Sequence, residues 1–189
     1  MKKFRKSFLL SLGILIAGFS FAQTSKMDNT VMVGGAAMFP SKNIIENAVN
    51  SKDHTTLVAA VKAAGLVETL QGAGPFTVFA PTNEAFDKLP AGTVDNLLKP
   101  ENKISLTSVL TYHVLAGKYN STDLYKLIKA GHGKATLKTV NGQELQFSMK
   151  GKTITVWDQA GSMAGVSIKD VNQSNGVIHV IDRVLLPKM

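Results

Sequence analysis

The hydrophobic pattern of this chain changes period near its last third, and this change limits the fold more than any other feature. Before residue 130, apolar residues recur at helical spacing in short segments, as Leu57 and Val61 do. After residue 135 they alternate with polar residues, as Leu145 and Phe147 do. Helices that cluster early and strands that cluster late predict an α+β fold rather than repeated βαβ units.

Turn signals place the main breaks in this pattern. An Asn-Gly pair at 141–142 is a strong hairpin signal, and a second pair at 175–176 precedes a long apolar segment, 177–186. Earlier, an apolar strand at 76–80 ends at Pro81, and Thr82 is placed to cap a helix. The strand at 177–186 has apolar residues on both faces, which predicts a strand buried on both sides.

The N-terminal segment has the pattern of a secretory signal. Four cations precede an apolar run from Phe8 to Phe21, and Ser20-Phe21-Ala22 has the small-x-small pattern of a cleavage site. The run is shorter than the roughly 20 apolar residues of a membrane-spanning helix. We therefore expect a signal peptide at 1–22, a flexible leader at 23–40 and one folded domain at 41–189, in a secreted or periplasmic protein without stable membrane insertion.

Charge and cysteine content exclude several classes of function. The full chain carries 21 Lys and Arg against 13 Asp and Glu, and removing the four cations of the signal leaves 17 against 13, or +4. Arg183 would then be the one remaining arginine, which argues against nucleic-acid recognition because bidentate base contacts depend on arginine. The chain has no cysteine, so disulfides, thiolate metal sites and cysteine nucleophiles are excluded.

Neither a metal site nor a catalytic centre is predicted. The four histidines lack the spacing of zinc ligands. The string around Ser162, AGSMAG, lacks the glycines of a nucleophile elbow and precedes a strand rather than a helix. We expect no enzymatic activity and no cofactor, with a hydrolase acting on matrix polymer as a weaker alternative.

Three blocks of sequence resemble a known family. They are 77–86 (TVFAPTNEAF), 110–115 (LTYHVL) and 175–187 (NGVIHVIDRVLLP). Their order and spacing are similar to those of the fasciclin (FAS1) domain family, over residues 44–187. The resemblance implies a wedge of about seven strands packed with several helices, in a secreted bacterial single-domain member. It also implies non-enzymatic adhesion to a cell-surface, matrix or envelope component, whether protein or polysaccharide, and it allows weak self-association.

The resemblance also suggests roles for individual residues. Tyr112 and His113 match a Tyr-His motif linked to adhesion in animal members, which makes them the candidate binding residues. A His between apolar neighbours is more often a buried core residue, so a structural role is the favoured interpretation of the pair. Integrin recognition does not carry over. Family members usually have an acid where Asn83 stands. Structural roles are expected for the other motif residues, which are Thr77, Phe79, Pro81, Thr82, Asn83, Phe86, Gly176, His179, Asp182 and Pro187.

A second function remains open. The domain could carry or sense a small apolar, lipid-like ligand in a cleft between helices and sheet. An apolar pocket lined by Phe86, Leu110 and Phe147 would favour this alternative, whereas a core of normal packing density would exclude it.

Overall fold

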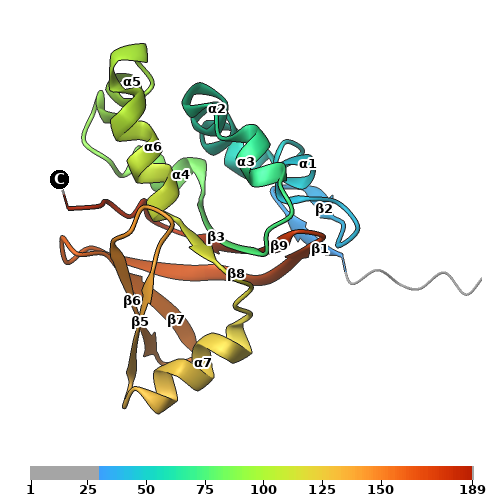
Figure 1. Ribbon diagram of the computed structural model, residues 1–189, viewed down its shortest axis with the longest axis vertical. Helices are drawn as coiled ribbons and strands as arrows, with labels where there is room; N and C mark the ends of the chain where they lie inside the picture. Colours follow the sequence, from blue (N-terminus) through green and yellow to red (C-terminus); the bar gives the residue numbers. More distant parts are fainter. Residues whose placement is uncertain (1–29, 189) are drawn as a thin grey trace, which may run out of the picture.

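A seven-stranded sheet forms the centre of the structure, a computed structural model that describes residues 30–188 (Figure 1). The order of strands is β4-β3-β9-β8-β7-β6-β5, in which β3 and β9 pair in parallel and the other neighbours are antiparallel. The bounds are β3 Phe76–Pro81, β4 Val114–Ala116, β5 Lys134–Lys138, β6 Glu144–Lys150, β7 Thr153–Trp157, β8 Met163–Gln173 and β9 Gly176–Ile181. The expected signal peptide lies outside the described residues.

The two edges of this sheet meet. Leu115 of β4 forms a bridge with Thr139, which directly follows β5, and the Val140 N–H donates to the Val114 carbonyl at 2.8 Å. The nearly closed sheet leaves few edge groups open to unwanted pairing. Together with the helices, it confirms the predicted α+β architecture with about seven strands.

Helices cover the sheet from two directions (Figure 1). Helices α1–α6 lie together on one side of β3 and β9. Helix α7 lies at the opposite end of the sheet, against β5 and β6. Their bounds are α1 Ile44–Ala48, α2 Thr55–Ala64, α3 Val67–Gln71, α4 Asn83–Asp87, α5 Thr93–Leu97, α6 Lys103–Tyr112 and α7 Ser121–Ala130. Short 3₁₀ turns at Lys52–His54 and Pro100–Asn102 precede α2 and α6.

The central strands separate two hydrophobic cores. Val78 and Ile178 face the core under α1–α6, whereas Phe79 and Ile181 face the core under α7, together with Phe147. Because successive side chains of a strand point to opposite faces, one strand can serve both cores. Every residue of β9 is buried, which confirms the prediction of a strand buried on both sides.

An N-terminal hairpin corrects the expectation of a flexible leader at 23–40. Its strands are β1 (Val31–Val33) and β2 (Ala36–Met38), and Val33 and Met38 are buried against the helical core. Two glycines with positive φ, 56° and 76°, form the turn between them. Small residues and glycines predict a mobile segment here, but the two short strands pair and bury Val33 and Met38. Residues 23–29 lie outside the described residues.

Candidate functional site

Tyr112, the first candidate binding residue, is fully buried. It ends α6, and its hydroxyl donates to the Glu144 carbonyl at 2.9 Å and accepts from the Gln159 N–H at 3.2 Å. Burial raises the pKa of this phenol. The side chain therefore ties α6 to β6 and to the loop after β7, and it offers no surface to a partner.

His113 is also buried, directly before β4. Its Nδ1 lies 2.8 Å from the Val109 carbonyl, and its Nε2 accepts the Leu185 N–H at 3.0 Å. The ring thus joins the end of α6 to the segment that follows β9. These contacts favour the structural interpretation of Tyr112 and His113 over a binding role, because both side chains are enclosed and both are satisfied by the protein itself.

The buried imidazole makes stability depend on pH. Burial lowers the pKa of His113 to about 4, whereas an unfolded chain has a value near 6.5. Between these values the unfolded state binds more protons, so stability should fall as the pH drops from 6.5 towards 4, by up to about 3 kcal/mol from this residue. Urea unfolding across this range measures the loss. NMR titration of the folded protein should show His113 still neutral at pH 5, and a ring that titrates near 6.5 would contradict the assignment.

Asn83 stands where the family resemblance implies an acid, and the structure shows what its amide does there. Its Oδ1 accepts the Thr56 N–H at 3.0 Å, while its Nδ2 donates to the Lys52 carbonyl at 2.9 Å. A carboxylate could accept but could not donate. The Asn83 amide therefore fixes the corner between β3 and α4 to the turn before α2. At the same corner, the Thr82 hydroxyl caps α4 by accepting the Ala85 N–H.

The other motif residues of the first block, 77–86, also contact the protein interior rather than solvent. The Thr77 hydroxyl donates to the Gly117 carbonyl at 2.7 Å and accepts the Tyr119 N–H at 2.9 Å, which holds the segment after β4. Phe79 is fully buried and stacks on His179, with ring centroids 5.5 Å apart. Pro81 and Phe86 are buried, in β3 and α4. These residues set the fold rather than a surface.

In the third block, His179 and Asp182 form hydrogen bonds with different partners. The His179 Nε2 lies 2.9 Å from the Tyr119 carbonyl, and its Nδ1 accepts the Asp170 N–H at 3.3 Å. The Asp182 carboxylate accepts the Gly165 N–H at 2.7 Å. Burial lowers the pKa of His179. Pro187 is buried after β9.

Gly176 opens β9 opposite Phe76 of β3, and its size is essential there. A Cβ at this position would overlap the Phe76 carbonyl oxygen, which belongs to the backbone and cannot rotate away. We expect Gly176→Ala to lower the free energy of unfolding by about 2 kcal/mol, the usual cost of overpacking. Gly165→Ala serves as the control, because a Cβ there would meet its nearest neighbour, the Asp182 carboxylate, at an ordinary contact distance of 3.6 Å. Equal stability of Gly176→Ala and the parent would contradict the close approach.

Serine, histidine and aspartate side chains meet near α7 without forming a catalytic triad. The Ser121 hydroxyl donates to the Asp170 carboxylate, but both ring nitrogens of His179 are engaged by backbone groups instead. A nucleophile needs a base within hydrogen-bond reach, and His179 is already committed. Ser162 is exposed in the loop between β7 and β8. Within residues 30–188, no group of three or more His, Asp and Glu is placed to hold a metal ion.

The long-range hydrogen bonds of Asn175 were not predicted from the sequence, where this residue indicates a turn. This buried side chain accepts the Ile44 N–H at 3.0 Å and donates to the Leu70 and Gly72 carbonyls at 2.8 and 2.9 Å. It thereby joins the turn before β9 to the start of α1 and the end of α3. The signal available in the sequence was an Asn followed by Gly, and that pair indicates a turn without indicating its long-range partners.

Comparisons with known proteins agree with this fold and these motifs. The family model described as "Fasciclin domain" matches residues 52–187. Protein sll1483 of Synechocystis sp. is 44% identical over 170 residues, covering 90% of this chain and 87% of the relative. Immunogenic protein MPT70 of Mycobacterium tuberculosis is 37% identical, covering 74% of this chain and 66% of the relative.

Two matches involve larger proteins. Human periostin is 33% identical over 76% of this chain, which corresponds to 16% of periostin. A domain pair from the insect cell adhesion molecule Fasciclin I has a similar fold, with a TM-score of 0.69 at 20% identity, over 78% of this chain and 52% of that one. From its motifs, its fold and these matches, the chain belongs to the fasciclin domain family.

Proposed function

We propose that this protein is a secreted, non-enzymatic adhesion module that binds a component of a cell surface, an extracellular matrix or an envelope. Family membership carries the proposal. Relatives include a cell surface glycolipoprotein of Mycobacterium bovis, and the similar fold comes from a cell adhesion molecule. Within residues 30–188, none of the helices is long and apolar enough to cross a membrane.

A lysine-rich surface around Tyr125 is the best candidate for the binding face. The Lys169 Nζ lies 3.1 Å from the Tyr125 hydroxyl and 5.2 Å from the ring centroid, and the Lys152 carbonyl lies 3.5 Å from the same hydroxyl. Lys129 lies one helical turn from Tyr125, on the same face of α7. All three lysines are exposed. We call Tyr125, Lys129, Lys152 and Lys169 the Tyr125 surface.

The chemistry of this surface favours an anionic partner. The Lys169 ammonium lies over the Tyr125 ring, and exposed lysines attract acidic groups at long range. The ring adds contact area with a polar hydroxyl at its edge. An acidic polysaccharide or an acidic protein surface of the envelope or matrix fits this combination. Tyr112 and His113 are buried elsewhere, so the proposed adhesion does not use them as contacts.

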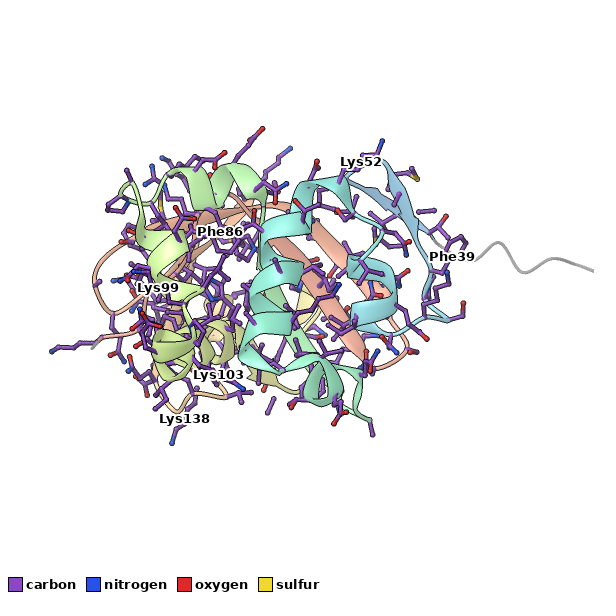
Figure 2. The ribbon with its side chains drawn as sticks, turned by 90° about the horizontal axis from the view of Figure 1, so that it is seen from above. Phe39, Lys52, Phe86, Lys99, Lys103 and Lys138 are labelled. Atoms are coloured by element: carbon purple, nitrogen blue, oxygen red, sulfur yellow. The ribbon has the colours of Figure 1, made fainter. Side chains whose placement is uncertain are left out.

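A charge-reversal experiment tests this placement. We expect the triple variant Lys129→Glu, Lys152→Glu, Lys169→Glu to bind the producing organism's cells and matrix about tenfold more weakly, because repulsion replaces attraction at the contact. The matched control reverses Lys52, Lys99 and Lys103, which are exposed in the helical half (Figure 2). Both variants have the same net charge. Equal loss of binding in the two variants would show that net charge alone drives binding. The assignment of binding to the Tyr125 surface would then be wrong.

A further inference from the structure

A cavity lies between the helical layer and the sheet, inside the core under α1–α6. Its volume is about 80 Å³, and its lining is almost entirely apolar. Val33 of β1, Ile44 of α1, Val61 of α2, Leu110 of α6 and Ile178 of β9 are among the lining residues. Seen from above, α2 and α3 lie across the sheet between the hairpin end, marked by Phe39, and the α4–α6 group, marked by Phe86 and Lys103 (Figure 2).

This cavity differs from the one that the sequence suggested. Of the three residues expected to line a pocket, Leu110 does so, but Phe86 and Phe147 do not. Phe147 belongs to the second core, on the other side of the central strands.

Of the polar residues that line the cavity, His54 is the one with a buried nitrogen that lacks a partner, and its ring is 3% exposed. Its Nδ1 lies 2.9 Å from the Ser51 hydroxyl, but its Nε2 has no hydrogen-bond partner. Burial lowers the pKa of His54, while the Ala80 backbone and the Asp53 charge raise it by less. The ring is therefore neutral at pH 7, with one unsatisfied nitrogen.

Such an atom costs about 1–3 kcal/mol unless something pairs with it. A water molecule is a poor occupant, because ordered waters need two to four polar partners and cavities lined by apolar groups stay dry. An occupant that combines hydrocarbon with one hydrogen-bonding group would satisfy both the walls and the nitrogen. A hydroxyl suits the site best, since it can donate or accept and so fits either tautomer of the imidazole.

Part of the cavity lining lies at the surface. Lys62, Thr69 and Val140 are exposed and also line the cavity. His54 precedes α2 and Lys62 lies in its last turn, so helical rise separates their backbones by about 12 Å. A slender molecule could therefore enter beside Lys62 and place its inner end at His54. Among the lining residues, Lys62 carries the charge at pH 7, and it lies at the exposed part of the lining. A ligand with a charged group at its inner end would therefore find no counterion beside His54.

We propose that this cavity binds the end of an aliphatic alcohol, with the hydroxyl hydrogen-bonded to Nε2 of His54 and the hydrocarbon against α2 and the central strands. The volume corresponds to roughly five to eight water-sized spheres, which suits a short chain end. The remainder of a longer molecule would extend past Lys62. This site is independent of the proposed adhesion through the Tyr125 surface, and either assignment can fail without the other.

Methyl NMR of the purified protein tests the proposal, with 1-hexanol as the probe and n-heptane vapour as a hydrocarbon of equal heavy-atom count. We expect saturable shifts of the Val61, Leu110 and Ile178 methyl groups with both, and tighter binding of 1-hexanol. His54→Leu should weaken 1-hexanol binding about tenfold, the value of one hydrogen bond, and leave heptane binding equal or stronger. His54→Gln, which keeps a hydrogen-bonding end, should retain the preference for the alcohol.

A cavity-filling variant supplies the matched control. Ala48 lines the cavity from a partly exposed helical position, so Ala48→Leu should fold normally and abolish binding of both probes. The absence of saturable shifts at the three lining residues in the parent protein would overturn the site. Equal affinity for 1-hexanol in the parent and in folded His54→Leu would overturn the hydroxyl contact. A water contact at His54 that persists in saturating 1-hexanol would likewise contradict it.

Discussion

Replacing His113 with alanine should lower the free energy of unfolding by about 4 kcal/mol. The change leaves the Leu185 N–H buried without an acceptor, at a cost of about 1–3 kcal/mol, and it opens a cavity where the ring packs, which adds a cost comparable to other large-to-small core changes. Urea unfolding followed by circular dichroism measures the difference. His113 lies in the Tyr-His motif, so this variant also separates a structural role from a binding role.

His132 provides the matched control for this experiment. It is exposed in the loop after α7, with φ at 53°, a conformation that Asn tolerates well. His132→Asn should change stability by no more than about 0.5 kcal/mol. At temperatures where His113→Ala remains folded, its binding to cells should match that of the parent. Lost binding with an unchanged thermal midpoint would contradict the structural assignment of His113.

Removing the Asn175 side chain should have an effect of similar size, about 4 kcal/mol for Asn175→Ala. Two buried backbone groups, at Ile44 and Leu70, and a partly buried one at Gly72 lose their partner together. Each unsatisfied group costs about 1–3 kcal/mol when water cannot reach it. Partial entry of water would reduce the total. Because the side chain joins α1, α3 and the turn before β9, its loss should also speed hydrogen exchange in α1 and α3.

Asn50 is the control for this second variant, since its amide bonds the Glu46 carbonyl at an exposed position. Asn50→Ala should cost less than about 1 kcal/mol, the net worth of an exposed hydrogen bond. If Asn175→Ala were as stable as Asn50→Ala, the three hydrogen bonds would contribute less to the free energy of unfolding than predicted.

The layout of the fold was predictable from local patterns. The change of period placed helices before strands, the Asn-Gly pairs marked two turns, and Thr82 marked the start of α4, all of which depend on neighbouring residues. The N-terminal hairpin escaped prediction because three-residue strands are too short to show alternation. The burial of β2 comes from contacts with α1, which follows it closely, and with β8, which is distant in sequence.

The candidate site was less predictable for the same physical reason. The family motif named Tyr112 and His113, but only the packing of α6 against β6 and the segment after β9 shows that both are enclosed. Asn83 and Asn175 act through backbone groups about 30 to 130 residues away, and no local pattern records such partners. The cavity depends on how helices and sheet meet, so its lining included one of three expected residues.

Binding of the purified protein to the producing organism's cells and matrix, measured across a salt titration, tests the adhesive function most directly. A heat-unfolded sample of the same protein serves as the control. We expect saturable binding that requires the fold, weakens as salt screens the lysines of the Tyr125 surface, and persists at moderate ionic strength. Binding that is equal for folded and unfolded protein, or that is absent at every salt concentration, would contradict the proposed function.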